Sequence, residues 1–185
     1  MKHAFISPVT YFDQIPDQST FHLCLAHLLP NEDYRNFYLQ KIERGDFIIL
    51  DNGAFENKVP YPLSQIGQMC HDYKFYPNVI VLPDYPMEHW TKTITESVLA
   101  LNKERHIIDW NCQFMAVPQS ERGDWRGWLA AYRTLSEHPL ISWVGMSILG
   151  IPNAFCELTG TNDVSFNRTY ATAYLIRNGL IQPVK

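Results

Sequence analysis

The sequence predicts an α/β fold in which short strands alternate with helices and form a mainly parallel sheet. Three observations lead to this prediction. Short apolar runs recur along the chain, segments of helical periodicity lie between most of them, and a polar residue or glycine marks four of the strand ends at intervals of 33, 35 and 26 residues. Such intervals suit one strand and one helix each. The units can form part of a (β/α) barrel or an open sheet, and six units are readable where a full TIM barrel has eight.

Six short apolar runs are predicted as strands, because each is bounded by polar, glycine or proline residues and is too short for a buried helix. They cover residues 4–6, 21–26, 48–50, 79–82, 114–117 and 143–148. Continuous apolar character without alternation is typical of parallel strands that are buried on both faces. We therefore expect other elements to cover the sheet.

Five intervening segments repeat apolar residues at every third or fourth position, which predicts helices with one buried face. They cover residues 32–44, 63–73, 89–105, 124–137 and 166–178. Gly179 follows the last of them and suits a C-cap. The interval 150–167 contains Pro152, Gly160 and Asn162 and is predicted as the longest loop.

Length and composition predict a single globular domain over residues 1–185. The chain is 46% hydrophobic and 18% charged, so it can bury a sizeable core. Its net charge of -4 argues against nucleic-acid binding through bulk electrostatics, although a local basic face is compatible with that charge. No apolar segment approaches the roughly 20 residues that cross a bilayer, and the N-terminus lacks the form of a signal peptide. We therefore expect a cytoplasmic protein with no membrane partner, including one that a virus makes in its host.

The sequence contains no recognisable metal or cofactor motif. The seven histidines are scattered and form neither a His-x-x-x-His nor a His-Glu-x-x-His pattern. A Gly-x-Gly-x-x-Gly loop and a Gly-x-Ser-x-Gly elbow are also missing from the sequence. We therefore predict no metal and no cofactor. Four widely spaced cysteines predict reduced, mostly buried thiols: Cys24, Cys70, Cys112 and Cys156.

The most informative segment is 48–56, where an apolar strand ends in a carboxylate, an amide, a glycine and an aromatic ring. The carboxyl ends of strands are where α/β enzymes place their chemistry. Asp51 could handle a proton there while the ring of Phe55 stacks on a planar ligand. The alternative is structural: Asp51 accepts backbone N–H bonds in a tight turn and Phe55 packs inward.

Two further strands end in polar side chains. Asp84 follows the strand at 79–82 between two prolines that stiffen the backbone, and its acceptor oxygens suit the N–H donors of a purine-like base. Gln119 follows the strand at 114–117, and its amide suits the carbonyl and amino edge of a base. The alternatives are a helix cap or turn for Asp84 and a solvated loop position for Gln119.

The last candidate is Gly145, whose backbone amide could meet a ligand oxygen. It could equally be a packing requirement inside the strand. If the four strand ends share one rim, Asp51 and Asp84 should repel each other unless a ligand donor or a proton intervenes.

In their order and spacing, these motifs resemble the queuine tRNA-ribosyltransferase (tRNA-guanine transglycosylase) superfamily, especially its short phage and archaeal relatives linked to 7-deazaguanine modification of DNA or RNA. The segment 50–56, Leu-Asp-Asn-Gly-Ala-Phe-Glu, resembles the family's Asp-Ser-Gly-Gly-(Phe/Tyr)-Gln segment. The segment 82–84, Leu-Pro-Asp, resembles its strand-end aspartate. The segment 116–119, Ala-Val-Pro-Gln, resembles its Val-Gln-Gly segment, and 144–147, Val-Gly-Met-Ser, resembles its Gly-Gly segment.

The resemblance implies a TIM-type barrel, here incomplete at about six βα units. It also implies a base exchange, in which a carboxylate attacks C1′ of a nucleotide, expels guanine and is displaced by a 7-deazaguanine. The implied partners are a guanine or 7-deazaguanine base and the DNA or tRNA that carries it. On this resemblance, Asp51 is the catalytic, base-contacting acid, and the base is bound by Asp51, Phe55, Asp84, Gln119 and the Gly145 amide.

The chain departs from the family after its sixth predicted strand. There the family has its nucleophilic aspartate and a zinc site of three cysteines and a histidine, whereas Asp163 is the only late aspartate here and has no matching motif around it. The alternative function is a non-catalytic base-binding or assembly subunit, or a truncated enzyme, acting as a homo-oligomer or with a partner subunit. A third hypothesis is an unrelated lyase or isomerase that acts on a small metabolite.

Overall fold

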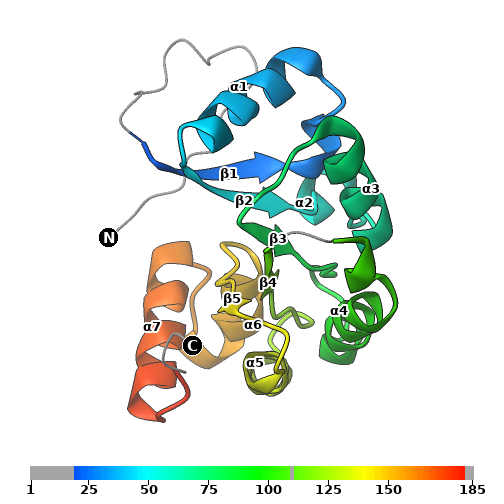
Figure 1. The fold of residues 1–185 in the computed structure, drawn as a ribbon. Helices are drawn as coiled ribbons and strands as arrows, with labels where there is room; N and C mark the ends of the chain where they lie inside the picture. The colour runs from blue at the N-terminus through cyan, green and yellow to red at the C-terminus, as the bar shows by residue number, and fades with distance from the viewer. Residues whose placement is uncertain (1–18, 109–110, 182–185) are drawn as a thin grey trace.

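The structure, a computed structural model, describes residues 19–108 and 111–181 and confirms the α/β class (Figure 1). Within these residues, five parallel strands form one sheet in the order β1-β2-β3-β4-β5, so neighbours in the sheet are also successive along the chain. The predicted strand at 4–6 lies outside the described residues. The strands are β1 (Phe21–Leu25), β2 (Phe47–Asp51), β3 (Val79–Val81), β4 (Gln113–Ala116) and β5 (Trp143–Val144).

Helices connect the strands, and those covering the sheet lie where the periodicity predicts them. Figure 1 shows α1, α3, α4 and α5 in succession around the outer face of the sheet. Asn31, Asp124 and Asp163 precede α1, α5 and α7, and each side chain accepts a hydrogen bond from its helix's own backbone. The helices are α1 (Glu32–Glu43), α2 (Ala54–Asn57), α3 (Leu63–Tyr73), α4 (Trp90–Glu104), α5 (Trp125–Glu137), α6 (Gly150–Thr159) and α7 (Val164–Arg177).

Alternate residues of each strand face opposite sides of the sheet. Ile48 and Leu50 of β2 belong to the main core, which also contains apolar residues of α1, α3, α4 and α5. Ile49 of β2 and Val81 of β3 belong to a separate apolar cluster. Asp51 follows Ile49 by two residues, so it lies on the face opposite the main core.

The sheet is strongly curved. The ring centroid of Phe47 in β2 lies 4.9 Å from that of Phe21 in β1 and 5.8 Å from that of Trp143 in β5. Three strand intervals separate β2 from β5, which amount to roughly 14 Å in a flat sheet. Rings that meet across this span indicate that the face carrying them is concave. In the described part of the chain, β1 and β5 are the two edges of the sheet.

The prediction of a long loop at 150–167 is wrong. Most of it is helical, because α6 occupies its first part and α7 begins at Val164. Pro152 lies in the first turn of α6, where its missing N–H removes no helical hydrogen bond. Phe155 of α6 is fully buried, and its ring centroid lies 5.5 Å from that of Trp128 in α5. Glycine and proline therefore begin a buried helix here, although they resemble a loop signal.

The strand predicted at 143–148 is shorter than expected. Only Trp143 and Val144 pair with β4. Residues 145–149 form a loop between β5 and α6 at the carboxyl end of the sheet. This loop becomes part of the candidate site described below.

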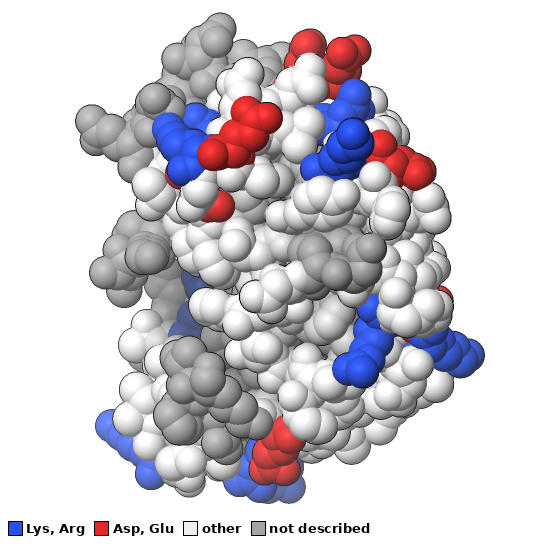
Figure 2. Space-filling model, viewed as in Figure 1, with Lys and Arg blue, Asp and Glu red and all other residues white. Residues whose placement is uncertain are grey.

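Charged side chains are dispersed over the face of the molecule that Figure 2 shows. Figure 2 shows Lys and Arg in separate groups, interspersed with Asp and Glu, around a broad uncharged area of the viewed face. The described atoms of this face therefore form no continuous basic band of the kind that attracts a phosphate backbone. Across residues 19–108 and 111–181, no helix combines the length and apolar character that a bilayer crossing requires.

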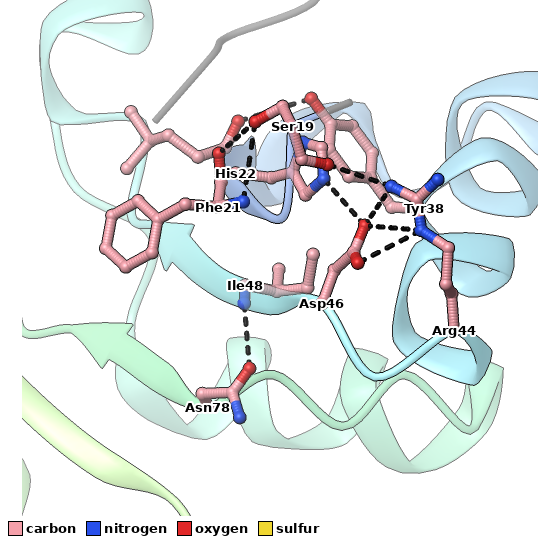
Figure 3. Close-up of polar contacts among 9 residues, drawn as sticks. Ser19, Phe21, His22, Tyr38, Arg44, Asp46, Ile48 and Asn78 are labelled. Carbon is pink, nitrogen blue, oxygen red and sulfur yellow. Dashed lines mark hydrogen bonds and ion pairs between the residues drawn. The ribbon is translucent and has the colours of Figure 1, made fainter. Parts of the chain in front are cut away.

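At the amino end of the sheet, Asp46 is buried in contact with two basic side chains (Figure 3). Its carboxylate accepts hydrogen bonds from His22 Nε2 and from Arg44 Nε, each at 3.0 Å. Burial acts to raise the pKa of Asp46, but the hydrogen bonds from Arg44 and His22 outweigh it and lower the pKa below its usual value. We call His22, Arg44 and Asp46 the amino-end cluster. The cluster joins β1, the end of α1 and the start of β2.

Candidate functional site

A cavity of about 580 Å³ opens at the carboxyl end of the sheet, and we call it the carboxyl-end pocket. Leu23 and Leu25 of β1 contribute to its apolar wall, and the loop after β5 lines it as well. Both edges of the curved sheet therefore contribute to one cavity. All five residues singled out from the sequence line it: Asp51, Phe55, Asp84, Gln119 and Gly145.

Asp51 ends β2, and its Oδ1 accepts a hydrogen bond from the Gly53 N–H at 2.8 Å. The turn expected from the structural alternative is therefore present, and it leaves Oδ2 with no hydrogen-bond partner among the described residues. The pKa of Asp51 is raised to about 6: burial is the main cause, the Gly53 hydrogen bond opposes it, and the charges of Asp84 and Glu56 add to the effect of burial. A carboxyl group with this pKa can take up and release a proton near neutral pH.

Asp84 is buried, and its carboxylate accepts hydrogen bonds from two neutral amides. Asn52 Nδ2 donates to Oδ1 at 2.8 Å, and Gln119 Nε2 donates to Oδ2 at 2.6 Å. Burial raises the pKa of Asp84 above its usual value, although both hydrogen bonds act to lower it. No described lysine, arginine or histidine forms an ion pair with Asp84. Its negative charge is therefore held by hydrogen bonds alone.

Asn52 fixes this arrangement and has no exposed surface. Besides its bond to Asp84, its Nδ2 donates to the carbonyl oxygen of Leu82 at 2.7 Å, and its Oδ1 accepts from the Ala54 N–H at 2.8 Å. The side chain thus connects the end of β2 to the segment after β3. The sequence interpretation assigned no role to Asn52, although an amide directly after a buried strand and beside a carboxylate is a usable signal.

Gln119 is 1% exposed, and its Oε1 has no hydrogen-bond partner among the described residues. Its Nε2 donates a hydrogen bond to Asp84, and this orientation of the side chain leaves Oε1 as an acceptor without a donor. Gly150 at the start of α6 makes room for this oxygen, because a Cβ at that position would lie 2.3 Å from Oε1. A buried acceptor without a donor costs free energy, which a ligand N–H in the pocket would recover.

Phe55 lies in the short helix α2 and is 56% exposed, so it does not pack inward as the alternative interpretation expects. Its ring is at the pocket, and Lys58 Nζ lies 5.0 Å from the ring centroid. Gly53 starts the turn with φ of +69°, and a Cβ there would lie 2.8 Å from His27 Nδ1. Glycine is therefore required to bring Phe55 to the pocket.

The backbone N–H of Gly145 is already paired, because it donates to the Ala116 carbonyl oxygen at 2.8 Å. A Cβ at this position would lie 2.9 Å from Val117 Cγ2, as the packing alternative requires. The segment 146–148 also lines the pocket, and its backbone N–H groups donate to no acceptor within the described residues. The donor expected at Gly145 is therefore available one to three residues later.

Metal-binding side chains do not gather in the described parts of the chain. Across them, no group of three or more His, Cys, Asp or Glu residues is close enough to hold a metal ion. Burial raises the pKa of the Cys24 and Cys70 thiols, which disfavours the reactive thiolate. As predicted, most thiols are buried: Cys24, Cys70 and Cys156 are buried, and Cys112 is partly buried.

The carboxyl-end pocket thus combines two carboxyl groups of raised pKa, an unpaired amide oxygen, backbone N–H donors and an exposed aromatic ring. These groups match a flat ligand that carries several N–H donors and at least one acceptor. Comparison with protein-family models, curated proteins and solved structures finds no match to this chain. We therefore infer function from the chemistry of the pocket.

Proposed function

We propose that the protein is a TIM-barrel-like member of the tRNA-guanine transglycosylase superfamily that binds a guanine or 7-deazaguanine base and exchanges it in DNA or tRNA. One observation carries the proposal. Asp51 ends β2, whereas Asp84 and Gln119 follow β3 and β4, and all three line the same pocket as Phe55. A chance match of short motifs would not require their side chains to share a cavity.

Two features of the sheet support a barrel-like fold. The strand order follows the chain order, as it does in a barrel, and the contact between Phe47 and Trp143 indicates barrel-like curvature. In barrels of this type the active site lies at the carboxyl ends of the strands, which is where the pocket opens.

Guanine carries the donors that this pocket lacks. Its N1–H and 2-amino groups can donate to the carboxylates of Asp51 and Asp84 and to Gln119 Oε1. Its O6 can accept from the backbone N–H groups of 146–148, and the ring of Phe55 is suited to stack on the base. Adenine would direct a ring-nitrogen lone pair at a carboxylate, so we expect guanine to bind more tightly than adenine.

Base exchange also requires a group that donates a proton to the departing base and accepts one from the arriving base. Asp51, with its pKa raised to about 6 by burial, can give a proton to the departing guanine and recover it from the incoming base. The covalent step needs a carboxylate near C1′ of the nucleotide. The described carboxylates that line the pocket are Asp51, Glu56 and Asp84.

A second candidate function, a base-binding or assembly subunit without transferase activity, is favoured by the position of Asp163. Its Oδ1 accepts a hydrogen bond from the Phe166 N–H at 2.6 Å, which caps α7. Asp163 does not line the carboxyl-end pocket. The only late aspartate therefore has a structural role and supplies no separate nucleophile.

Two assays with radiolabelled guanine test the proposal. Equilibrium dialysis measures binding of the base, and incorporation into unmodified tRNA or DNA oligonucleotides measures exchange. We expect both binding and exchange, and we expect Asp84→Asn to weaken binding. Binding without exchange would support the subunit function. Failure of guanine and of 7-deazaguanine to bind would overturn both functions and favour an enzyme of small metabolites.

A further inference from the structure

A second cavity, of about 520 Å³, lies between the loop after β5 and α7, and we call it the α7 groove. Its α7 residues recur at every third or fourth position, so they form one face of that helix. The groove is lined by Met146, Ser165, Arg168, Thr169, Thr172, Ala173 and Ile176.

Three hydrogen-bond donors on this face have no partner among the described residues. They are the guanidinium of Arg168 and the hydroxyl groups of Ser165 and Thr169, and all three residues are exposed. Thr172 differs, because its hydroxyl donates to the Arg168 carbonyl oxygen at 2.8 Å. The groove therefore presents one cation and two hydroxyl donors on successive turns of a single helix.

The α7 groove adjoins the carboxyl-end pocket, because Met146 lines both cavities. The two cavities have opposite electrostatic character. The pocket contains Asp51, Glu56 and Asp84, whereas Arg168 is the charged residue that lines the groove. A ligand that spans both would carry neutral N–H donors at one end and a negative charge at the other.

We propose that the α7 groove binds a phosphate group of the nucleotide whose guanine base occupies the carboxyl-end pocket. This inference rests on the proposed function, and it specifies that the ligand is a nucleotide or a nucleotide within a strand, not the free base alone. A guanidinium matches the geometry of phosphate oxygens, and neighbouring hydroxyl groups can complete their hydrogen bonding. Among the residues that line the groove, Arg168 is the one that is charged, so recognition would depend on this single local cation.

The test compares guanosine, 5′-guanosine monophosphate and a single-stranded hexanucleotide with one guanine, by calorimetric titration at moderate ionic strength. The unmodified chain is compared with two variants, Arg168→Ala and Arg177→Ala. Arg177 is an exposed arginine at the end of the same helix and does not line the groove, so its variant is a matched control for the lost charge.

We expect the monophosphate, the hexanucleotide or both to bind about tenfold more tightly than guanosine, as a charge-assisted hydrogen bond to phosphate provides. Arg168→Ala should abolish this advantage and leave guanosine binding unchanged, whereas Arg177→Ala should preserve it. If only the hexanucleotide binds more tightly than guanosine, the groove binds a phosphate of the strand. If the monophosphate also binds more tightly, the groove binds the 5′-phosphate of the nucleotide.

Two results would overturn the inference: neither phosphate ligand binds more tightly than guanosine, or the advantage survives in Arg168→Ala. A failure of the proposed function would give a different result. If guanine and guanosine do not bind while the phosphate ligands bind in an Arg168-dependent manner, base recognition fails and the phosphate site stands.

Discussion

The two ends of the sheet hold a buried carboxylate in opposite ways. Asp46 at the amino end and Asp84 at the carboxyl end are both 6% exposed, so burial alone does not distinguish them. Asp46 is paired with Arg44 and His22, and its pKa is lowered. Asp84 receives hydrogen bonds from neutral amides, and burial raises its pKa. The charge of Asp46 is therefore compensated by basic side chains of the same chain, although His22 Nδ1 has no hydrogen-bond partner among the described residues. Asp84 has no such cation, so a donor or a proton from a ligand can complete the carboxyl-end pocket.

The two ends also differ in the sign of their pH dependence. Asp46 has a lowered pKa, so it stabilises the fold above its unfolded pKa, and this contribution is lost as the pH falls through its folded pKa. Asp51 has its pKa raised by burial to about 6. The native state therefore binds the extra proton between about pH 4 and pH 6, and ionised Asp51 lowers stability above that interval.

The largest effect is expected from Asp46→Ala. This change leaves His22 Nε2 buried without an acceptor and removes the carboxylate that pairs with Arg44, which should lower the free energy of unfolding by about 3 kcal/mol. Urea unfolding at pH 7, followed by tryptophan fluorescence, measures it. Asp72→Ala is the control, because Asp72 is exposed and should change stability by less than about 0.5 kcal/mol. A loss below about 1 kcal/mol for Asp46→Ala would contradict the role of the cluster.

The next effect is on binding and comes from Asp84→Asn. Replacing the carboxylate by an amide removes an oxygen that accepts hydrogen bonds from Gln119 and, in the proposed complex, from the base. Guanine should therefore bind roughly 30-fold more weakly, equivalent to about 2 kcal/mol. Because the substitution also removes an unpaired buried charge, the melting temperature should not fall, in contrast to Asp46→Ala. Equilibrium dialysis and thermal unfolding measure the two quantities. Unchanged affinity would remove Asp84 from the proposed binding site.

Asp51→Asn should stabilise the fold by about 1 to 2 kcal/mol at pH 7.5, because it removes a buried charge and keeps an acceptor for the Gly53 N–H. At pH 4.5 the folded carboxyl group is largely protonated, so the difference should shrink to less than half of its value at pH 7.5. Urea unfolding at the two pH values provides the comparison. A stabilisation that is equal at both pH values would show that ionisation of Asp51 is not its cause.

The smallest effect is expected from Phe55→Ala. Loss of stacking on the base should weaken guanine binding by about 1 kcal/mol, roughly fivefold. The ring is 56% exposed, so the free energy of unfolding should change little. Val59→Ala is a matched control, because Val59 is a similarly exposed apolar residue that does not line the pocket. Equal losses of affinity in both variants would argue against stacking.

Much of the fold could be predicted from local sequence signals. The apolar runs that become β1 to β5 are short and continuous, so their positions follow from burial on both faces. Helix α6 could not be predicted in this way, because Gly150 and Pro152 resemble loop signals. Its helical form depends on packing against α5, where Phe155 meets Trp128, and that contact is invisible in a local pattern.

In the candidate site too, some features could be predicted from local sequence signals and others depend on tertiary packing. Asp51 and Asp84 could be selected because polar residues at strand ends converge in a parallel sheet. The unused oxygen of Gln119 and the space that Gly150 leaves for it depend on the relative placement of β4 and α6, which no motif encodes. The amino-end cluster could not be predicted either, because His22 meets Asp46 only through the register between β1 and β2.

The most direct test of the central claim, that the carboxyl-end pocket is completed by a donor-rich base, is proton release on guanosine binding. Calorimetric titration at pH 6, repeated in buffers of different ionisation enthalpy, measures the number of protons exchanged. Hydrogen bonds from the base to ionised Asp51 should lower its pKa from about 6, so binding should release up to about half a proton. Release that disappears in Asp51→Asn is the predicted result. Binding with no proton release, or with proton uptake, would contradict the claim.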